Sequence, residues 1–296
     1  MSIKNPIMKL AEPIVKPITK LILLKHYDRN KKISALESSQ DVVILAPHMD
    51  DETIGLGGTI YNYQKQSTKV HCIFITDGAS SNGKADRDQV SVLRKKEIDQ
   101  VKGLLGISEV YYVDVPDGKV TGNQQAEQVI RELIKQINPK VIYTSSNVDA
   151  HPDHVGTAQL LASVLAKDES LAPLIRQYEI NCPMPPDEIN YVVDITEAFP
   201  IKKKATSVFK SQVIAFDGFL LLSEVKSNLV NNRSIKHVEG FIELPRKEFI
   251  ARTSRLKEKN HPYPQLFKQA NRSVTLLWAI FKNYKMKKRI YRESKK

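Results

Sequence analysis

Apolar, β-branched runs alternate with helix-like stretches through the middle of this chain, and this alternation restricts the possible folds more than any other feature. The strand-like runs lie at 42–46, 69–75, 109–114 and 140–145, and the helix-like stretches near 53–65, 87–105, 122–137 and 154–166. Further strand-like runs at 176–181 and 190–195 precede a helix near 197–212. Strands separated by helices pair in parallel through right-handed crossovers. We therefore expect an α/β fold with a Rossmann-like, doubly wound, mostly parallel sheet in the order 3-2-1-4-5.

Two clusters of histidine and aspartate follow the first and the fourth of these strands. Residues 48–52 read His-Met-Asp-Asp-Glu, and residues 151–154 read His-Pro-Asp-His. In the expected strand order these two strands are neighbours, and a crevice opens between their carboxyl ends. Imidazoles and carboxylates at such a crevice are the ingredients of a hydrolytic metal site. The sequence therefore predicts a metal site at the C-terminal ends of strands 1 and 4.

The glycines at 55–58 give little support to nucleotide binding. The run reads Gly-Leu-Gly-Gly, and residue 60 is isoleucine where the dinucleotide fingerprint has glycine. The run also begins inside the expected helix, so we do not expect a nucleotide cofactor.

The charge of the chain is concentrated at its two ends. The net charge is +12 over 296 residues, of which residues 1–32 carry +6, residues 246–296 carry +13 and the middle carries −7. Because the basic residues lie outside the body of the chain, we expect no specific nucleic-acid partner. The two cysteines, Cys72 and Cys182, do not form a disulfide framework, which suits a cytoplasmic protein.

Both ends contain short amphipathic segments. Apolar residues recur at helical spacing near the N-terminus, with lysines off that stripe, while Pro13 and Pro17 should kink or break the helix; the stripe consists of Ile7, Leu10, Ala11, Ile14, Ile18 and Leu21. Residues 274–281 form a second apolar segment, which is followed by a basic run. We expect a basic N-terminal extension at 1–39, a central domain at 40–245 and a basic C-terminal extension at 246–296. The extensions either lie on the anionic, cytoplasmic face of a membrane or pack on the domain.

Residues 47–52 resemble the first signature of the PIG-L/LmbE-like zinc deacetylases, usually Ala-His-Pro-Asp-Asp-Glu, and residues 151–154 resemble the second. The similarity covers roughly residues 40–245, and further matches lie at residues 76–78, Arg94, Glu97, residues 116–118, Lys204 and residues 211–212. Two sequence positions depart from the family pattern. Met49 replaces the usual proline without removing a functional group, and Asp149 lies where some relatives have a tyrosine near the reaction centre.

The resemblance implies a metal centre with a catalytic base. His48, Asp51 and His154 match the family's zinc ligands, and a His/Asp site also accepts other divalent ions. Asp50 matches the general base that takes a proton from the attacking water, although an aspartate here also suits a helix N-cap. We expect Glu52 to be structural, because an acid in the first turn of a helix suits its dipole.

The second signature and two further residues complete the implied site. Asp153 matches a carboxylate that orients His151, whose protonated form stabilises the oxyanion or protonates the leaving amine; a loop held by an Asp–His hydrogen bond is the alternative. Arg94 matches a substrate-binding arginine, but an intrahelical pair with Glu97 is nearly as reasonable. Asp117 matches a position near the sugar hydroxyls, or is simply a turn residue.

The resemblance as a whole implies a zinc-dependent N-deacetylase acting on an amino sugar. The expected substrate is an N-acetylglucosamine-type glycoconjugate, and the basic ends make a lipid-linked form of it one option. Two alternatives stay open at this point. One is a zinc amidohydrolase acting on a non-sugar amide or a thiol conjugate, and the other is a non-catalytic protein that binds membranes or polyanions.

Overall fold

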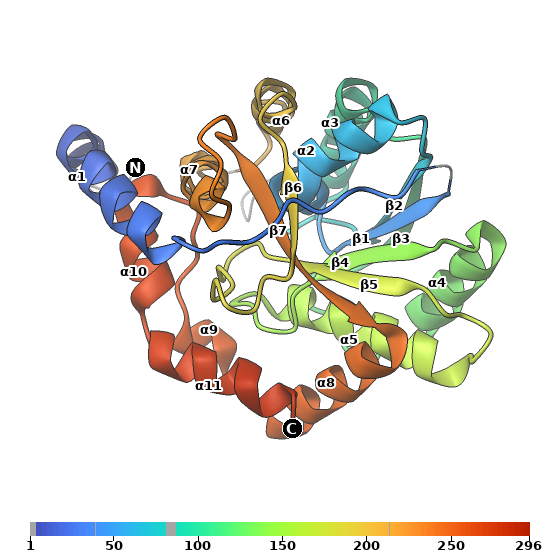
Figure 1. Cartoon of the computed structure of the whole chain (residues 1–296). Helices are drawn as coiled ribbons and strands as arrows, with labels where there is room; N and C mark the ends of the chain where they lie inside the picture. Colours follow the sequence, from blue (N-terminus) through green and yellow to red (C-terminus); the bar gives the residue numbers. More distant parts are fainter. Residues whose placement is uncertain (1–3, 39, 81–86, 213) are drawn as a thin grey trace.

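The computed structural model describes residues 4–38, 40–80, 87–212 and 214–296. Within these residues the chain forms a seven-stranded sheet in the order β3-β2-β1-β4-β5-β7-β6 (Figure 1). The strands are β1 Val42–Ala46, β2 Val70–Thr76, β3 Glu109–Val115, β4 Val141–Ser145, β5 Leu174–Tyr178, β6 Tyr191–Asp194 and β7 Val238–Pro245. Strands β1 to β5 pair in parallel, and β7 runs antiparallel to both β5 and β6. The expected α/β class and the order 3-2-1-4-5 are confirmed.

Helices cover both faces of this sheet (Figure 1). One face carries α2 Asp51–Lys65, α3 Arg87–Leu105 and α6 Phe199–Thr206, and the other carries α4 Gln124–Ile137, α5 Pro152–Lys167 and α8 Arg246–Lys259. Because both faces are covered, every residue of β1, β2 and β4 is buried. Val42 of β1 lies opposite Val70 of β2 and Val141 of β4. The loops that follow β1 and β4 therefore emerge side by side at one edge of the sheet.

The antiparallel end of the sheet is the part that differs from expectation. Strand β7 was not expected, because glutamates at 239 and 243 and a glycine at 240 interrupt its apolar residues. Glu239 is nevertheless buried, where it accepts hydrogen bonds from Lys202 Nζ at 2.6 Å and from the backbone of Thr59 at 2.8 Å. Strand β5 begins and ends earlier than the expected 176–181, and α6 ends at Thr206 rather than near 212.

The glycines of α2 allow close packing between helix and sheet. A Cβ at Gly55 would lie 2.4 Å from the ring of Tyr178, and one at Gly58 would lie 2.6 Å from Ile195. Leu56 has non-helical backbone angles, so α2 is kinked at this point. The glycine run therefore serves packing against the sheet rather than phosphate binding.

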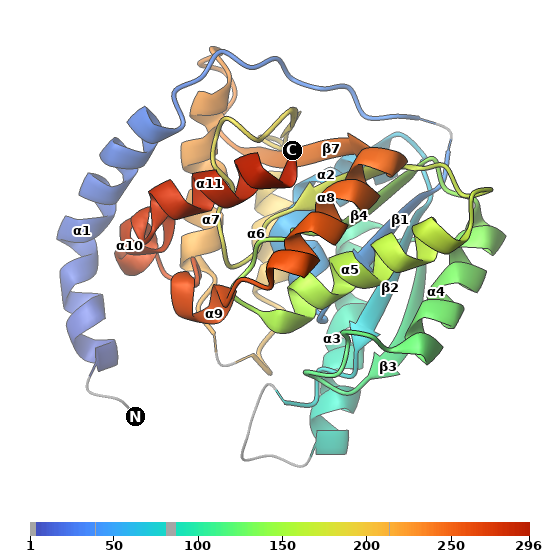
Figure 2. The ribbon, with the colours of Figure 1, turned by 90° about the horizontal axis from the view of Figure 1, so that it is seen from below.

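The two ends of the chain pack on the body of the protein (Figure 2). Helix α1 Lys4–His26 contacts α7 Asp217–Val225, η2 Ser273–Thr275 and α10 Leu276–Phe281, and α11 Tyr284–Ser294 packs on α8; η1 Lys226–Leu229 and α9 Tyr263–Leu266 complete the described elements. Pro13 and Pro17 lie inside α1, which continues past both. No helix among the described residues is long and apolar enough to cross a membrane. The division at residues 39 and 245 stays a prediction.

Candidate active site

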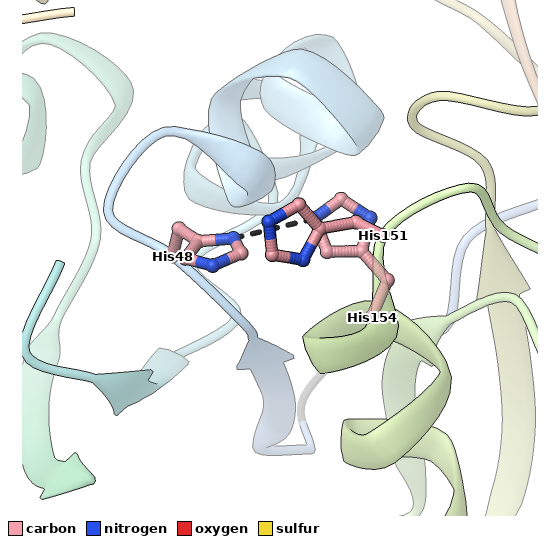
Figure 3. Close-up of side chains that lie close together, drawn as sticks. All are labelled: His48, His151 and His154. Atoms are coloured by element: carbon pink, nitrogen blue, oxygen red, sulfur yellow. Dashed lines mark hydrogen bonds between the residues drawn. The ribbon is translucent and has the colours of Figure 1, made fainter. Parts of the chain in front are cut away.

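Three expected metal ligands converge on one point at the carboxyl edge of the sheet. His48 follows β1, Asp51 is the first residue of α2, and His154 lies in the first turn of α5. Asp51 Oδ2 lies 3.1 Å from His48 Nδ1 and 3.2 Å from His154 Nε2, and the two ring nitrogens are 3.2 Å apart. Figure 3 shows the His48 and His154 rings facing one another beside His151.

The donor set fits a zinc ion. Zinc–nitrogen bonds of about 2.0–2.1 Å in tetrahedral geometry separate neighbouring ligand atoms by about 3.3 Å, close to the spacing of these three. His48 and His154 also form, with His151, a group of imidazoles whose nitrogens lie within 4.8 Å of one another. Two imidazoles and one carboxylate are a common ligand set of hydrolytic zinc sites. These residues could hold a metal ion without rearrangement.

Two further carboxylates hold the histidines in place. Asp149 is 1% exposed, and its Oδ1 lies 3.1 Å from His154 Nδ1, so that Nε2 faces the cluster. Asp149 also accepts hydrogen bonds from the backbone amides of His151 at 2.8 Å and Asn181 at 2.9 Å. On the other side, Asp153 Oδ2 lies 3.4 Å from His48 Nε2. Carboxylates in this position fix the ring and raise its basicity.

The cluster favours a positive charge at its centre. Burial opposes protonation of His48, but hydrogen bonds to Asp153 and Asp51 raise its pKa to about 9. Burial likewise opposes ionisation of Asp51, yet His154 and His48 hold the pKa of that carboxyl far below its usual range. The pKa of His154 is raised despite burial, because Asp51 and Asp149 face it. A divalent cation would satisfy the same carboxylates.

Asp50 lies beside the cluster in a different environment. It is the N-cap residue of α2, but its side chain makes no capping hydrogen bond. Its Oδ1 lies 3.3 Å from Arg94 Nη2, and Arg94 also donates to the backbone carbonyls of Met49 at 2.9 Å and Gly78 at 3.1 Å. Burial and the charge of Asp51 raise the pKa of Asp50 to about 6, against the opposing effect of Arg94. A carboxylate with this pKa suits proton transfer near neutral pH.

Arg94 is therefore part of the pocket rather than of a helix-surface ion pair. The side chain is 2% exposed, and Gln212 lies against its guanidinium group. Glu97 instead accepts hydrogen bonds from Ser211, at 2.8 Å from the backbone amide and 2.6 Å from the hydroxyl. Arg94 contacts Met49 through the backbone carbonyl, a group that proline also has. Methionine can therefore replace proline here without loss of this hydrogen bond.

His151 and Asp153 lie at the start of α5. His151 is the N-cap residue, and its Nδ1 accepts a hydrogen bond of 3.3 Å from the backbone amide of Asp153. The Asp153 carboxylate lies 3.9 Å from His151 Nδ1, farther than from His48. Burial and the neighbouring imidazoles lower the pKa of His151 to about 4, so the resting ring is neutral rather than protonated.

Asp117 and Glu52 occupy contrasting positions. Asp117 lines the pocket, where its Oδ2 accepts a hydrogen bond of 2.6 Å from the backbone amide of Ser80 and its Oδ1 lies 4.0 Å from His48 Nε2. Glu52 is fully buried beneath the site, next to Thr53. Burial raises the pKa of Glu52 to about 8, so the side chain is mainly neutral at pH 7 rather than a charge that complements the helix dipole.

The expected residues surround one pocket of about 450 Å³. All eight line it, while Gly118 and Gln212 had been matched to the family only as parts of longer segments. The lining residues that sequence reasoning missed are Ile54, Ser80, Ile180, Asn181, Ile214, Phe219, Gln269 and Asn271. Gln269 and Asn271 come from the C-terminal segment, more than one hundred residues after the second cluster. No local motif distinguishes them, so their position depends on the tertiary fold.

Comparisons with known proteins relate this chain to one family. The PIG-L family model, described as GlcNAc-PI de-N-acetylase, matches residues 43–165, which include both clusters. A probable N-acetyl-alpha-D-glucosaminyl L-malate deacetylase 2 from Bacillus anthracis is 25% identical over 139 residues, which cover 44% of this chain and 62% of that relative. The protein of the same description from Bacillus cereus is 30% identical over 188 residues, which cover 59% of this chain and 84% of the relative.

A solved structure supports the fold over a longer stretch. N,N'-diacetylchitobiose deacetylase from Pyrococcus horikoshii superposes with a TM-score of 0.61 at 21% identity, covering 84% of this chain and 95% of that one. At this identity the likeness shows the fold alone. Family membership rests on the family model and on the relative from Bacillus cereus. From these matches, the chain belongs to the PIG-L family.

Proposed function

We propose that the protein is a zinc-dependent N-deacetylase that hydrolyses the acetamide of an amino sugar, releasing acetate and a free amine. The convergence of His48, Asp51 and His154 within 3.2 Å of one another is the observation that carries this proposal. The substrates named for the Bacillus and Pyrococcus relatives make an N-acetylglucosamine-type sugar the first candidate. A zinc ion bound there supplies a Lewis acid that polarises the acetamide carbonyl and lowers the pKa of the attacking water.

Asp50 acts as the general base in this proposal. Arg94 holds one carboxylate oxygen of Asp50, which leaves the other to accept the proton of the attacking water. The pKa of about 6 keeps Asp50 mostly ionised at neutral pH while leaving it basic enough to take a proton. In the same way the carboxylic acid that forms is strong enough to return the proton to the leaving amine.

His151 stabilises the negative charge that develops on the acetamide oxygen. Its Nδ1 already accepts the Asp153 amide, so in the neutral ring the proton is on Nε2. A neutral imidazole can donate this Nε2–H to the oxyanion. The role proposed here therefore requires no imidazolium in the resting site.

The pocket offers hydrogen-bond acceptors and an apolar surface to a sugar. Carboxylates of Asp50, Asp51, Asp117 and Asp153 line it against the guanidinium of Arg94. Asp117 Oδ1 is buried and has no hydrogen-bond partner in the part of the chain that the structure describes, so it can accept from sugar hydroxyls. Phe219 provides an apolar part of the wall. A neutral acetylated sugar fits this chemistry, whether free or linked to a lipid.

Metal analysis combined with acetate release tests the proposal. Wild-type protein, Asp50→Ala, His154→Ala and the exposed control Glu132→Gln are each assayed on a panel of N-acetyl sugars and non-sugar acetamides. We expect one zinc per chain in the wild type, loss of metal and activity in His154→Ala, and retained metal with a loss of about 100- to 10,000-fold in kcat for Asp50→Ala. Full metal occupancy in His154→Ala would contradict the ligand set. Acetate release from non-sugar amides alone would favour the amidohydrolase alternative.

A further inference from the structure

Helix α1 packs on the protein with the face opposite to its apolar stripe. Val15, Thr19 and Leu23 face the protein, and the last two are fully buried. Most of the stripe faces solvent instead, with exposed fractions of 80% for Leu10, 70% for Ile14, 52% for Ile18 and 72% for Leu21, while Ala11 is half-buried. Ile22, next to Leu21, is 42% exposed. The side chain of Ile7 lies outside the described residues. Such an apolar row on solvent is unusual for a helix whose other face is packed.

Helix α10, which contacts α1, carries two exposed aromatic residues. Trp278 is 56% exposed and Phe281 is 40% exposed. The ring of Phe281 packs edge-on against His26 at the end of α1, with centroids 5.0 Å apart, and both ribbon views show α10 beside α1 (Figures 1 and 2). We call this surface the apolar face: Leu10, Ile14, Ile18, Leu21, Ile22, Trp278 and Phe281. These are seven of the twelve exposed large apolar side chains among the described residues, and all seven lie on two helices that contact each other.

Basic residues flank the apolar face. Lys268 and Lys282 each place Nζ 5.9 Å from the ring centre of Trp278, and Lys25 is exposed on α1 at the helical position of the stripe. The two chain segments that supply the face carry +6 and +13, whereas the rest of the chain carries −7. Apolar side chains with a tryptophan at the edge and lysines around them match the headgroup region of an anionic bilayer. A second copy of the chain offers no such charge match, because it would bring the same positive charge.

Helix α1, whose outer side carries the apolar face, packs with its inner side on the segment that walls the pocket. Gln269 and Asn271 line the pocket, while η2, directly after them, contacts α1. The carbonyl of Asn271 accepts a hydrogen bond of 3.1 Å from Gly218 in α7, the helix that supplies the pocket residue Phe219. Helix α1 would therefore lie between a surface docked on the apolar face and the segment that walls the pocket.

We propose that the apolar face docks the protein on the surface of an anionic lipid bilayer, with the side chains of α1 and α10 inserted between headgroups. The further idea that this docking brings the pocket to a lipid-linked amino sugar rests on the proposed function; the docking itself does not.

Trp278 provides a direct measurement, because it is the only tryptophan of the chain. Vesicles of phosphatidylcholine alone, or mixed with phosphatidylglycerol, are titrated into the full-length protein while tryptophan emission is followed, and co-flotation is measured in parallel. We expect a blue shift and flotation with the anionic vesicles, weakened by salt, and little of either with phosphatidylcholine alone.

Three double variants test separately the apolar side chains, the lysines beside Trp278 and the effect of added negative charge elsewhere on the protein. Ile14→Glu/Ile18→Glu should bind anionic vesicles at least about tenfold more weakly, and Lys268→Gln/Lys282→Gln about tenfold more weakly. Val92→Glu/Leu93→Glu, on exposed apolar positions of α3, adds the same charge and should bind nearly as the wild type does. Acetate release from a soluble sugar reports the proposed function independently of flotation.

Unshifted Trp278 emission in the folded wild type with anionic vesicles would overturn the docking proposal. So would a concentration-dependent shift without vesicles, which indicates a second copy on this face, or equal weakening in the α3 control. The wild-type measurement remains decisive even if a glutamate variant loses helix α1, which circular dichroism would reveal.

Discussion

The site at the ends of β1 and β4 and the apolar face of α1 and α10 reverse the usual distribution of side chains in opposite ways. At the site, charged groups are buried: Asp51 is 3% exposed and Asp149 is 1% exposed. On α1, apolar groups are exposed, with Leu21 at 72%. Asp51 and Asp149 accept hydrogen bonds from within the fold, whereas most of the surface of Leu10 and Leu21 is in solvent. At the site, other groups of the protein offset the cost of burying charge. On α1, a partner outside this chain would have to cover the apolar side chains.

Two leucines of α1 give the largest expected difference. Leu23 is fully buried and Leu21 is exposed, although only one residue separates them. Leu23→Ala should lower the free energy of unfolding by about 2–5 kcal/mol, because it leaves a cavity against the body of the protein. Leu21→Ala should change it by no more than about 0.5 kcal/mol. Urea unfolding curves measure both, and equal effects would mean that the two faces of α1 are not distinguished in solution.

Asp149→Asn tests whether a carboxylate within the fold supports the metal ligand His154. Removing the charge that faces His154 Nδ1 should weaken zinc binding about 10- to 100-fold, while the ligands themselves remain. Competition with a chelator measures the affinity. Asp187→Asn, which alters an exposed ion pair with Arg29, is the control and should leave the affinity unchanged. Unaltered zinc affinity in Asp149→Asn would show that His154 is held without it.

The pH dependence of activity examines the environment of Asp50. Because burial and Asp51 raise its pKa to about 6, protonation removes the base below that pH, and kcat/KM should fall about tenfold per pH unit there. Above pH 6 the ionised base is available and the activity should level off. Residual activity in Asp50→Asn should lack this acid limb. If the limb persists in the variant, a different group titrates.

Glu52→Gln should have its smallest effect on stability at low pH, where the Glu52 carboxyl is protonated in both the folded and the unfolded chain. Burial raises the pKa of Glu52 from an ordinary value of 4.5 to about 8, so between these values the folded protein binds more protons than the unfolded chain. Stability should therefore decrease as pH rises through this window, by at most about 1.4 kcal/mol per pH unit, and Glu52→Gln should remove this contribution. Thermal unfolding at several pH values compares the two proteins. Identical pH dependence would contradict a neutral Glu52.

The sequence predicted the parallel core and the local parts of the site well. Residues 48–52 and 151–154 follow strands that their own composition reveals, and the order of those strands brings the clusters together. Strand β7 escaped prediction because its glutamates find partners from distant segments, as Glu239 does with Lys202. Which strand joins a sheet at its edge is decided by such distant contacts.

Other features depend on packing that no local pattern contains. Periodicity identified an apolar stripe on α1, but the side that packs is set by α7 and η2, more than 180 residues away in the chain. The place of Asp149 behind His154 likewise requires the loop that carries Asn181. Aspartate in a loop is too common to signal such a role.

Gln269 and Asn271 have an evolutionary consequence. The groups proposed for bond cleavage all lie between residues 48 and 154, within the stretch that the family model matches, while these two wall residues come from well outside it. Mutations in the late segment can therefore alter which molecule enters without disturbing the cleavage machinery. Homologues that differ in this segment but keep both histidine clusters should differ in substrate specificity while catalysing the same reaction.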